Sequence, residues 1–424
     1  MGHNTLALLL LGSLLLLPTS VNPQDLHPAP QPSHPSDGAE AGNPVARTRF
    51  VGDAACFSCH WDSSASYRAT AHQLASQLAN RNSILGTFTP GFNILAISDP
   101  SRALFDPTLY FKMVMKDDGY YETAVAEWGS HVQTRSERID IVTGSGVRAQ
   151  TYLFWHGDQL FELPVSYWAD GRQWINSPGF QDGLVNFVRP IYPRCLECHA
   201  TYIQTLSPDP LTNRYNKASL VTGISCETCH GPGADHIALQ KHMPSNPRRQ
   251  SILNPATFSR DRQVDLCALC HNGIQRESLG PSFTYVPGQP LDKYLKPIPV
   301  EEAEPPDVHG DQVGLLKRSR CYLSSPQMSC STCHDVHAPE KPAAEYSARC
   351  LTCHQVKSCG IYKTMGRMIA KNCIDCHMPV LPTGTIVSRT AGNVVRARMR
   401  THWIKVYPDT QPPGLPEKLP RQPR

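Results

Sequence analysis

The chain has 424 residues, of which 18% are charged, and 40 Lys and Arg against 36 Asp and Glu give a formal net charge of +4. A balance this close to neutral gives no support for a nucleic-acid partner. The length alone would suit two or three domains.

An apolar run of twelve residues, 6–17, lies near the amino terminus. This length is typical of a signal peptide, whereas a membrane span needs roughly 20 apolar residues. We therefore expect residues 1–21 to be a signal peptide and the protein to be periplasmic or extracellular. Because no Lys or Arg precedes the run, an uncleaved anchor stays open as the alternative, and only then would the protein contact a membrane. The proline-rich segments 22–48 and 408–424 are predicted to be a disordered linker and a tail.

A five-residue unit, Cys-x-x-Cys-His, begins the ordered part of the chain and occurs seven times. Two thiols three residues apart face the same side of a helical turn, and the next residue places an imidazole beside them. Zinc sites use paired Cys-x-x-Cys units, but zinc gives no reason for a histidine after every unit. The pattern is the attachment signature of a c-type haem, so we predict seven covalently attached haems c. The predicted attachment cysteines are Cys56, Cys59, Cys195, Cys198, Cys226, Cys229, Cys267, Cys270, Cys330, Cys333, Cys350, Cys353, Cys373 and Cys376, and the predicted proximal iron ligands are His60, His199, His230, His271, His334, His354 and His377.

The first haem segment is expected at 49–109, with a helix at 62–80 that carries His72. Residues 110–190 contain no motif, and their alternating pattern with hairpin signals at Asp118-Gly119 and Gly157-Asp158 predicts an inserted β-rich subdomain. Expected strands lie near 110–115, 120–126, 138–142, 151–155 and 160–168.

Six motifs fall within a haem-rich domain predicted at 191–407. About 30 residues for each haem are too few for separate apolar cores, so the haems should supply much of the core. We expect a mostly α and irregular multihaem cytochrome with short helices, plus the small inserted antiparallel sheet. Cys321 and Cys359 lie outside the motifs and are predicted to form a disulfide, with two free thiols as the alternative.

Each iron needs a sixth ligand or remains open. The distal candidates are the histidines outside the motifs and the predicted linker: His72, His131, His156, His236, His309, His337 and His402, with His242 the weakest. His236 and His337 each follow a motif after a short turn. His131 and His156 fall in the predicted sheet, where a structural role is equally plausible.

The stretches GISCETCHGPGADH, MSCSTCHDVH and NCIDCHMP resemble the multihaem cytochromes c with doubled CXXCH motifs. That superfamily includes the tetrahaem cytochrome of nitrifying bacteria, octahaem hydroxylamine oxidoreductase and pentahaem nitrite reductase. The β-like stretch is similar to exported multihaem proteins that are often fused to tetratricopeptide repeats. The resemblance covers most of 50–405 and implies distal ligands at His236, His337 and His402. The chain departs from the family's enzymes, because it has no C-x-x-C-K unit and seven motifs instead of eight.

Two main functions follow from these patterns. In the favoured one, the protein carries electrons along mostly bis-histidine haems and exchanges them with redox partner proteins or components of a respiratory chain. In the alternative, one open haem acts on a small nitrogen or sulfur compound. A third hypothesis is a filament-forming or otherwise oligomeric cytochrome, in which a neighbouring subunit supplies a ligand.

Overall fold

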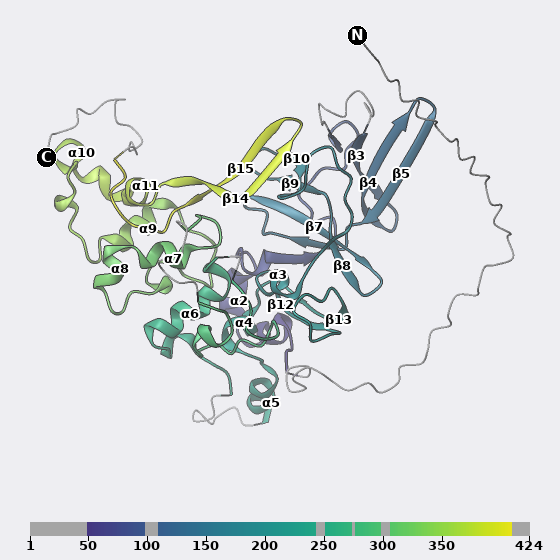
Figure 1. Cartoon of the computed structure of the whole chain (residues 1–424). Coiled ribbons are helices and arrows are strands. Elements are labelled where there is room, and N and C mark those ends of the chain that lie inside the picture. The colour runs from purple at the N-terminus through teal and green to yellow at the C-terminus, as the bar shows by residue number, and fades with distance from the viewer. Residues whose placement is uncertain (1–48, 98–108, 243–250, 274–275, 298–305, 409–424) are drawn as a thin grey trace, which may run out of the picture. The chain divides into compact units, whose positions relative to one another are not determined.

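A computed structural model describes residues 49–97, 109–242, 251–273, 276–297 and 306–408 of the chain (Figure 1). The predicted signal peptide, the predicted linker and nearly all of the predicted tail lie outside these residues. Among the helices that the structure describes, none is long and apolar enough to cross a membrane.

Antiparallel sheets make up the segment between the first and second motifs. A seven-stranded sheet has the order β1-β6-β7-β8-β11, with β9 paired to β7 and β10 to β9, and a four-stranded sheet has the order β2-β3-β4-β5. The strands are β1 (Ser76–Leu78), β2 (Ile94–Ala96), β3 (Leu109–Lys116), β4 (Gly119–Trp128), β5 (His131–Arg138), β6 (Ile141–Thr143), β7 (Ala149–His156), β8 (Gln159–Glu162), β9 (Val165–Trp168), β10 (Gln173–Asn176) and β11 (Arg189–Pro190).

The inward faces of these strands form an aromatic core. Phe111, Tyr152, Phe154 and Trp174 are buried together, as the period-2 pattern of a half-buried strand requires. Glu122 lies fully buried in the same strands, where its Oε2 accepts a hydrogen bond of 3.1 Å from the backbone amide of Val165. Burial raises the pKa of the Glu122 carboxyl well above its usual value.

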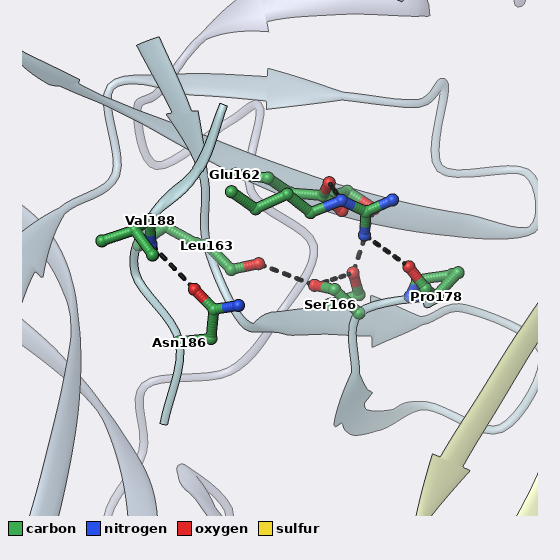
Figure 2. A network of polar contacts seen from close by, with 9 residues as sticks. Glu162, Leu163, Ser166, Pro178, Asn186 and Val188 are labelled. Carbon is green, nitrogen blue, oxygen red and sulfur yellow. Dashed lines mark hydrogen bonds and ion pairs between the residues drawn. The ribbon is translucent and has the colours of Figure 1, made fainter. Parts of the chain in front are cut away.

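A polar network fixes the end of this region next to the second motif (Figure 2). Arg189 on β11 lies 3.3 Å from the Glu162 carboxylate and donates a hydrogen bond of 2.8 Å to the carbonyl of Pro178. Ser177 donates to the carbonyl of Leu163 over 2.8 Å. Burial raises the pKa of Glu162 to about 7, although the Arg189 charge opposes the shift. The network therefore holds the strand from which the chain enters the second motif.

Short helices carry the motifs, and two hairpins interrupt them. The hairpins are β12 (Ala200–Thr205) with β13 (Tyr215–Thr222), and β14 (Val380–Thr390) with β15 (Asn393–Arg400). The α-helices are α1 (Asp53–Phe57), α2 (Trp61–Tyr67), α3 (Pro193–Glu197), α4 (Cys226–His230), α5 (Ala234–His242), α6 (Arg260–His271), α7 (Gln312–Lys317), α8 (Arg320–Ser324), α9 (Ala343–Cys350), α10 (Tyr362–Met365) and α11 (Cys373–His377). Short 3-10 turns are η1 (Gln73–Ala75), η2 (Pro255–Thr257), η3 (Leu291–Lys293), η4 (Cys330–Thr332), η5 (Val356–Ser358) and η6 (Gly366–Lys371).

The predicted fold class, mostly α and irregular, is wrong. About 28% of the structure is helical and about 28% is strand, in several antiparallel sheets. The fold-class prediction assumed that the segments between closely spaced motifs are long enough only for short helices. The chain instead leaves the second and the seventh motifs directly into a hairpin, since β12 starts at Ala200 and β14 at Val380.

The helix predicted at 62–80 is also wrong beyond its first two turns. It ends at Tyr67, and Ser76–Leu78 forms strand β1, which pairs with β6. The apolar residues of this segment fit helical spacing, but pairing with a distant strand determines their conformation. Strands β3 and β4 confirm the prediction at 110–115 and 120–126, whereas β5 was not predicted.

Candidate haem-binding centres

Each motif forms a helical turn that presents its groups on one side. In the first motif the amide of His60 donates to the carbonyl of Cys56 over 3.0 Å, and in the fifth the amide of His334 donates to Cys330 over 2.9 Å. These are bonds between residues four apart, so the first cysteine and the histidine lie one above the other. The local fold therefore assembles two thiols and one imidazole at each motif.

Several motif histidines are oriented by a hydrogen bond from Nδ1. Nδ1 of His230 lies 2.8 Å from the carbonyl oxygen of Leu253, and Nδ1 of His377 lies 3.0 Å from that of Lys405. A carbonyl only accepts, so Nδ1 must carry the proton and Nε2 keeps its lone pair for a metal. The same holds for His199 with the carbonyl of Ala75 at 3.3 Å and for His271 with Oε1 of Gln312 at 3.1 Å.

Four motif histidines face a second imidazole from a distant segment. The ring centres are 6.4 Å apart for His60 and His236, 6.1 Å for His230 and His337, 6.0 Å for His334 and His402, and 6.1 Å for His72 and His271. The ring planes differ by 25° or 26° in the first three pairs and by 69° in the fourth.

These separations fit two imidazoles that bind opposite sides of one iron. A metal–nitrogen bond of about 2.0 Å and a distance of about 1.1 Å from nitrogen to ring centre place the two centres roughly 6.2 Å apart. Ordinary aromatic contacts cover a wide range, about 4.5–7 Å. Four histidine pairs within 6.0–6.4 Å, each containing one motif histidine, are therefore better explained by ligation than by packing.

Three of the predicted distal histidines have a buried ring nitrogen. Nδ1 of His236, His309 and His402 is buried and has no hydrogen-bond partner among the described residues. Burial also lowers the pKa of His72 and of His402 to about 4, so both rings are neutral at physiological pH, as a ligand must be.

The other predicted distal histidines separate into two groups. Burial lowers the pKa of His309, and the nearby Asp307 carboxylate opposes this shift. His199 and His271 also lie close enough to lower this pKa, so His309 could be the partner of His199. His131 begins β5 and His156 ends β7, so both lie exposed at hairpin turns, and His242 is exposed at the end of α5. Among the described residues, none of these three contacts a motif histidine.

Contacts between motifs show which of them are neighbours. The amide of Cys226 donates to Asp53 over 3.1 Å, Arg194 donates to the carbonyl of Leu269 over 2.7 Å, and Ser329 donates to Oε1 of Gln263 over 2.9 Å. The first motif thus adjoins the third, and the fourth adjoins both the second and the fifth. Further on, α9 packs against α11, which brings the sixth and seventh motifs together.

Glu227 clamps the first and third motifs. Its carboxylate accepts hydrogen bonds from the amides of Val51 at 2.9 Å, Gly52 at 2.8 Å and Gly233 at 2.8 Å. In return, the amide of Cys226 donates to Asp53 over 3.1 Å. Sequence reasoning missed Glu227, because a residue between two motif cysteines carries no signal for such a contact.

The predicted bridge between Cys321 and Cys359 is not formed in the structure, where both thiols are free. Cys321 interacts electrostatically with Cys333 and Cys350, and Cys359 with Cys373 and Cys376. The two thiols therefore lie beside different motifs.

Comparison with known proteins agrees with these centres. Residues 186–231, which include the second and third motifs, match the family described as cytochrome c554 and c-prime. The chain is 23% identical to the C-type polyheme cytochrome OmcC of Geobacter sulfurreducens over 229 residues, 48% of this chain and 28% of that protein. It is 26% identical to the multiheme cytochrome MtrA of Shewanella baltica over 167 residues, 38% of this chain and 37% of that protein.

The fold is also similar to a solved structure. The outer cell wall cytochrome OcwA superposes with a TM-score of 0.54 and 19% identity, covering 84% of this chain and 80% of that one. The matched region spans only 28% of the length of OmcC and 37% of that of MtrA. These similarities relate the chain to multihaem c-type cytochromes, whose haem c is covalently bound.

Proposed function

We propose that the protein is an exported heptahaem c-type cytochrome that transfers electrons along a chain of mostly bis-histidine haems. The observation that carries this proposal is the recurrence of a motif histidine and a distant histidine at 6.0–6.4 Å. Each haem would supply one iron that cycles between the ferric and ferrous states. An iron that binds two imidazoles favours electron transfer over substrate binding, because it has no free coordination position.

The residues divide this work between attachment, ligation and tuning. The motif cysteines would hold the haems, and the motif histidines would bind the irons through Nε2. His236, His337, His402 and His72 would complete the centres of the first, third, fifth and fourth motifs, and His309 that of the second. Backbone carbonyls on Nδ1 fix the orientation of the ring and raise its basicity as a ligand.

The contacts between motifs support a defined route. Arg194 joins the second motif to the fourth and Ser329 joins the fifth to the fourth. Cys353 of the sixth motif lies close enough to Cys333 of the fifth to add to the effect of burial, which raises the pKa of Cys333. The seventh motif follows through the packing of α9 on α11, while the first and third form a side branch. Electrons would therefore enter and leave near the second and the seventh motifs, in exchange with redox partner proteins.

A count of haems and of their spin states tests the proposal. Denaturing mass spectrometry of mature protein should show seven haem adducts, and electron paramagnetic resonance should show at least five low-spin ferric centres. Fewer than five low-spin centres in fully loaded protein would contradict the assignment of the histidine pairs. Amino-terminal sequencing of the exported protein should start after residue 17, which tests the proposed signal peptide.

A second function, reaction at an open haem, is favoured by one observation. Among the described residues, no second histidine lies across from His354 or His377 at the distance found in the four pairs. If one of these irons is five-coordinate, it could bind a small nitrogen or sulfur compound. Stoichiometric binding of cyanide by the oxidised wild-type protein would support this function, and its absence would leave electron transfer alone.

A further inference from the structure

The segment around the seventh motif carries an unusual excess of positive charge. Residues 355–408 contain nine Lys and Arg and a single acid, Asp375, a net charge of +8 in a chain whose total is only +4. Asp375 is already neutralised by Arg400 at 2.9 Å. The remaining eight cations are exposed, and none forms an ion pair with another described residue: Lys357, Lys363, Arg367, Lys371, Arg389, Arg396, Arg398 and Lys405.

Three of these cations lie on one face of the β14–β15 hairpin. Val387 pairs with Arg396 and Arg389 with Val394, so these side chains share a face, and Arg398 follows two residues after Arg396. The opposite face is buried, since Ala397 packs with Trp168 and Ile175. The hairpin is therefore anchored on one side and presents its arginines to solvent on the other. We call Arg389, Arg396 and Arg398 the arginine face.

The hairpin is fixed in position at both ends. Near its tip, the amide of Asn176 on β10 donates to Thr390 over 2.8 Å, and the side chain of Asn176 donates to the carbonyl of Arg389 over 2.7 Å. At its base, Arg400 donates to the carbonyl of Met378 over 2.7 Å, directly after the last motif histidine. Figure 1 shows the hairpin in yellow beside β9 and β10. The arginine face is thus a rigid surface that starts at the seventh motif.

We propose that the arginine face, with the exposed lysines around the seventh motif, docks a redox partner protein whose own cofactor is surrounded by acidic side chains. This inference rests on the proposed function, because it names the partner at the seventh-motif end of the electron route. Docking makes and breaks no covalent bond. One electron leaves the reduced partner of the pair and arrives on the oxidised one.

The extent of the charged surface favours a protein over a small anion. The arginine face runs from Arg389, opposite Val394, to Arg398, four residues further along β15, which is about 13 Å at 3.3 Å for each residue. The five other exposed cations of 355–408 lie outside this face and extend the positive charge beyond it. A small anion needs only two or three converging cations.

Electron transfer from an acidic flavodoxin, used as the probe, tests the docking surface. The variant replaces the arginine face with Arg389→Gln, Arg396→Gln and Arg398→Gln. The control, Lys112→Gln, Lys116→Gln and Lys217→Gln, removes the same charge from exposed positions of the β-rich region. Stopped-flow mixing of reduced flavodoxin with oxidised cytochrome gives the second-order rate at several ionic strengths, and calorimetry with oxidised flavodoxin gives the affinity.

Electrostatic steering changes association rates by factors of about 10 to 10³. We expect the arginine variant to react about tenfold more slowly at low salt, with weaker binding and a smaller dependence on salt, while the control stays within about twofold of wild type. An equal loss in both variants, or no loss in either, overturns the docking surface. Unchanged haem potentials in the arginine variant are also expected, whereas shifted potentials would assign the arginines to haem propionates and overturn the proposal. Reduction by dithionite tests the proposed function separately from the docking surface. If dithionite cannot reduce the protein, the proposed electron transfer is wrong, whatever the arginine variant shows.

Discussion

Replacing His402 by Ala should open one iron and leave the rest of the protein intact. The His402 ring centre is 6.0 Å from that of His334, and the ring is buried without a hydrogen bond at Nδ1. The backbone does not depend on the ring, because Ser319 donates to the carbonyl of His402 over 3.1 Å and accepts from the amide of Ile404 over 2.7 Å. The substitution therefore removes a ligand while the segment stays anchored.

The expected size of the effect is one haem per chain. Relative to wild type, the oxidised His402→Ala protein should gain one high-spin centre, bind one additional equivalent of cyanide, and regain the low-spin signal when imidazole is added. Electron paramagnetic resonance and an optical cyanide titration measure these changes. The matched control is His156→Ala, an exposed histidine at a hairpin turn, which should behave as wild type.

Two results would refute this reasoning. If His402→Ala stayed fully low-spin, the ring–ring distance would reflect packing and not ligation. If His156→Ala produced the same high-spin centre, the distal ligands would not be those that the structure brings together.

Three further predictions concern the supporting structure. Glu162→Gln should flatten the pH dependence of stability. The pKa of Glu162 is raised to about 7, so the folded wild type binds the proton more tightly than the unfolded chain does. The free energy of unfolding of the wild type should therefore fall by on the order of 3 kcal/mol between pH 4 and pH 8, as measured by chemical denaturation. Gly223→Ala should lower the melting temperature and add high-spin haem. Gly223 has a φ of +70°, and a Cβ there would meet the carbonyl oxygen of Gln73, the residue after His72, at 2.2 Å. An unchanged melting curve would contradict this prediction. The bridge between Cys321 and Cys359 stays a prediction, and thiol labelling of the unfolded, unreduced chain should modify no cysteine if it forms and two if both are free as in the structure.

The sequence predicted the local geometry of the motifs better than their surroundings. The motif histidines are local in sequence, so their position beside two thiols follows from one helical turn. Distal ligation is a tertiary property. His236 and His337 follow the third and fifth motifs, yet their rings face His60 and His230, which belong to other motifs.

The strands also show that local patterns predict only the structure that local residues determine. Alternating residues and turn signals were enough to predict β3 and β4, because both lie in one hairpin with Asp118-Gly119 between them. No local pattern indicated β14 and β15. Arg396 and Arg398 flank Ala397, which is buried against Trp168 and Ile175 of another sheet. Helical spacing at 62–80 failed for a related reason, as β1 is determined by its pairing with β6.

The two parts of the chain are stabilised by different means, and this explains why the sheets are so extensive. The β-rich region has a continuous apolar core around Phe111, Tyr152 and Trp174, which needs no cofactor. The haem-rich region has a smaller cluster around Val264 and Leu295, and its centres join histidines that are far apart in sequence. Closing such long loops costs entropy, which metal ligation offsets only once the haems are attached. Strand β1 pairs with β6, and the β14–β15 hairpin packs on β10. These contacts connect the motif-bearing segments to the sheets. The sheets therefore support the segments that bring the histidine rings to 6.0–6.4 Å from one another.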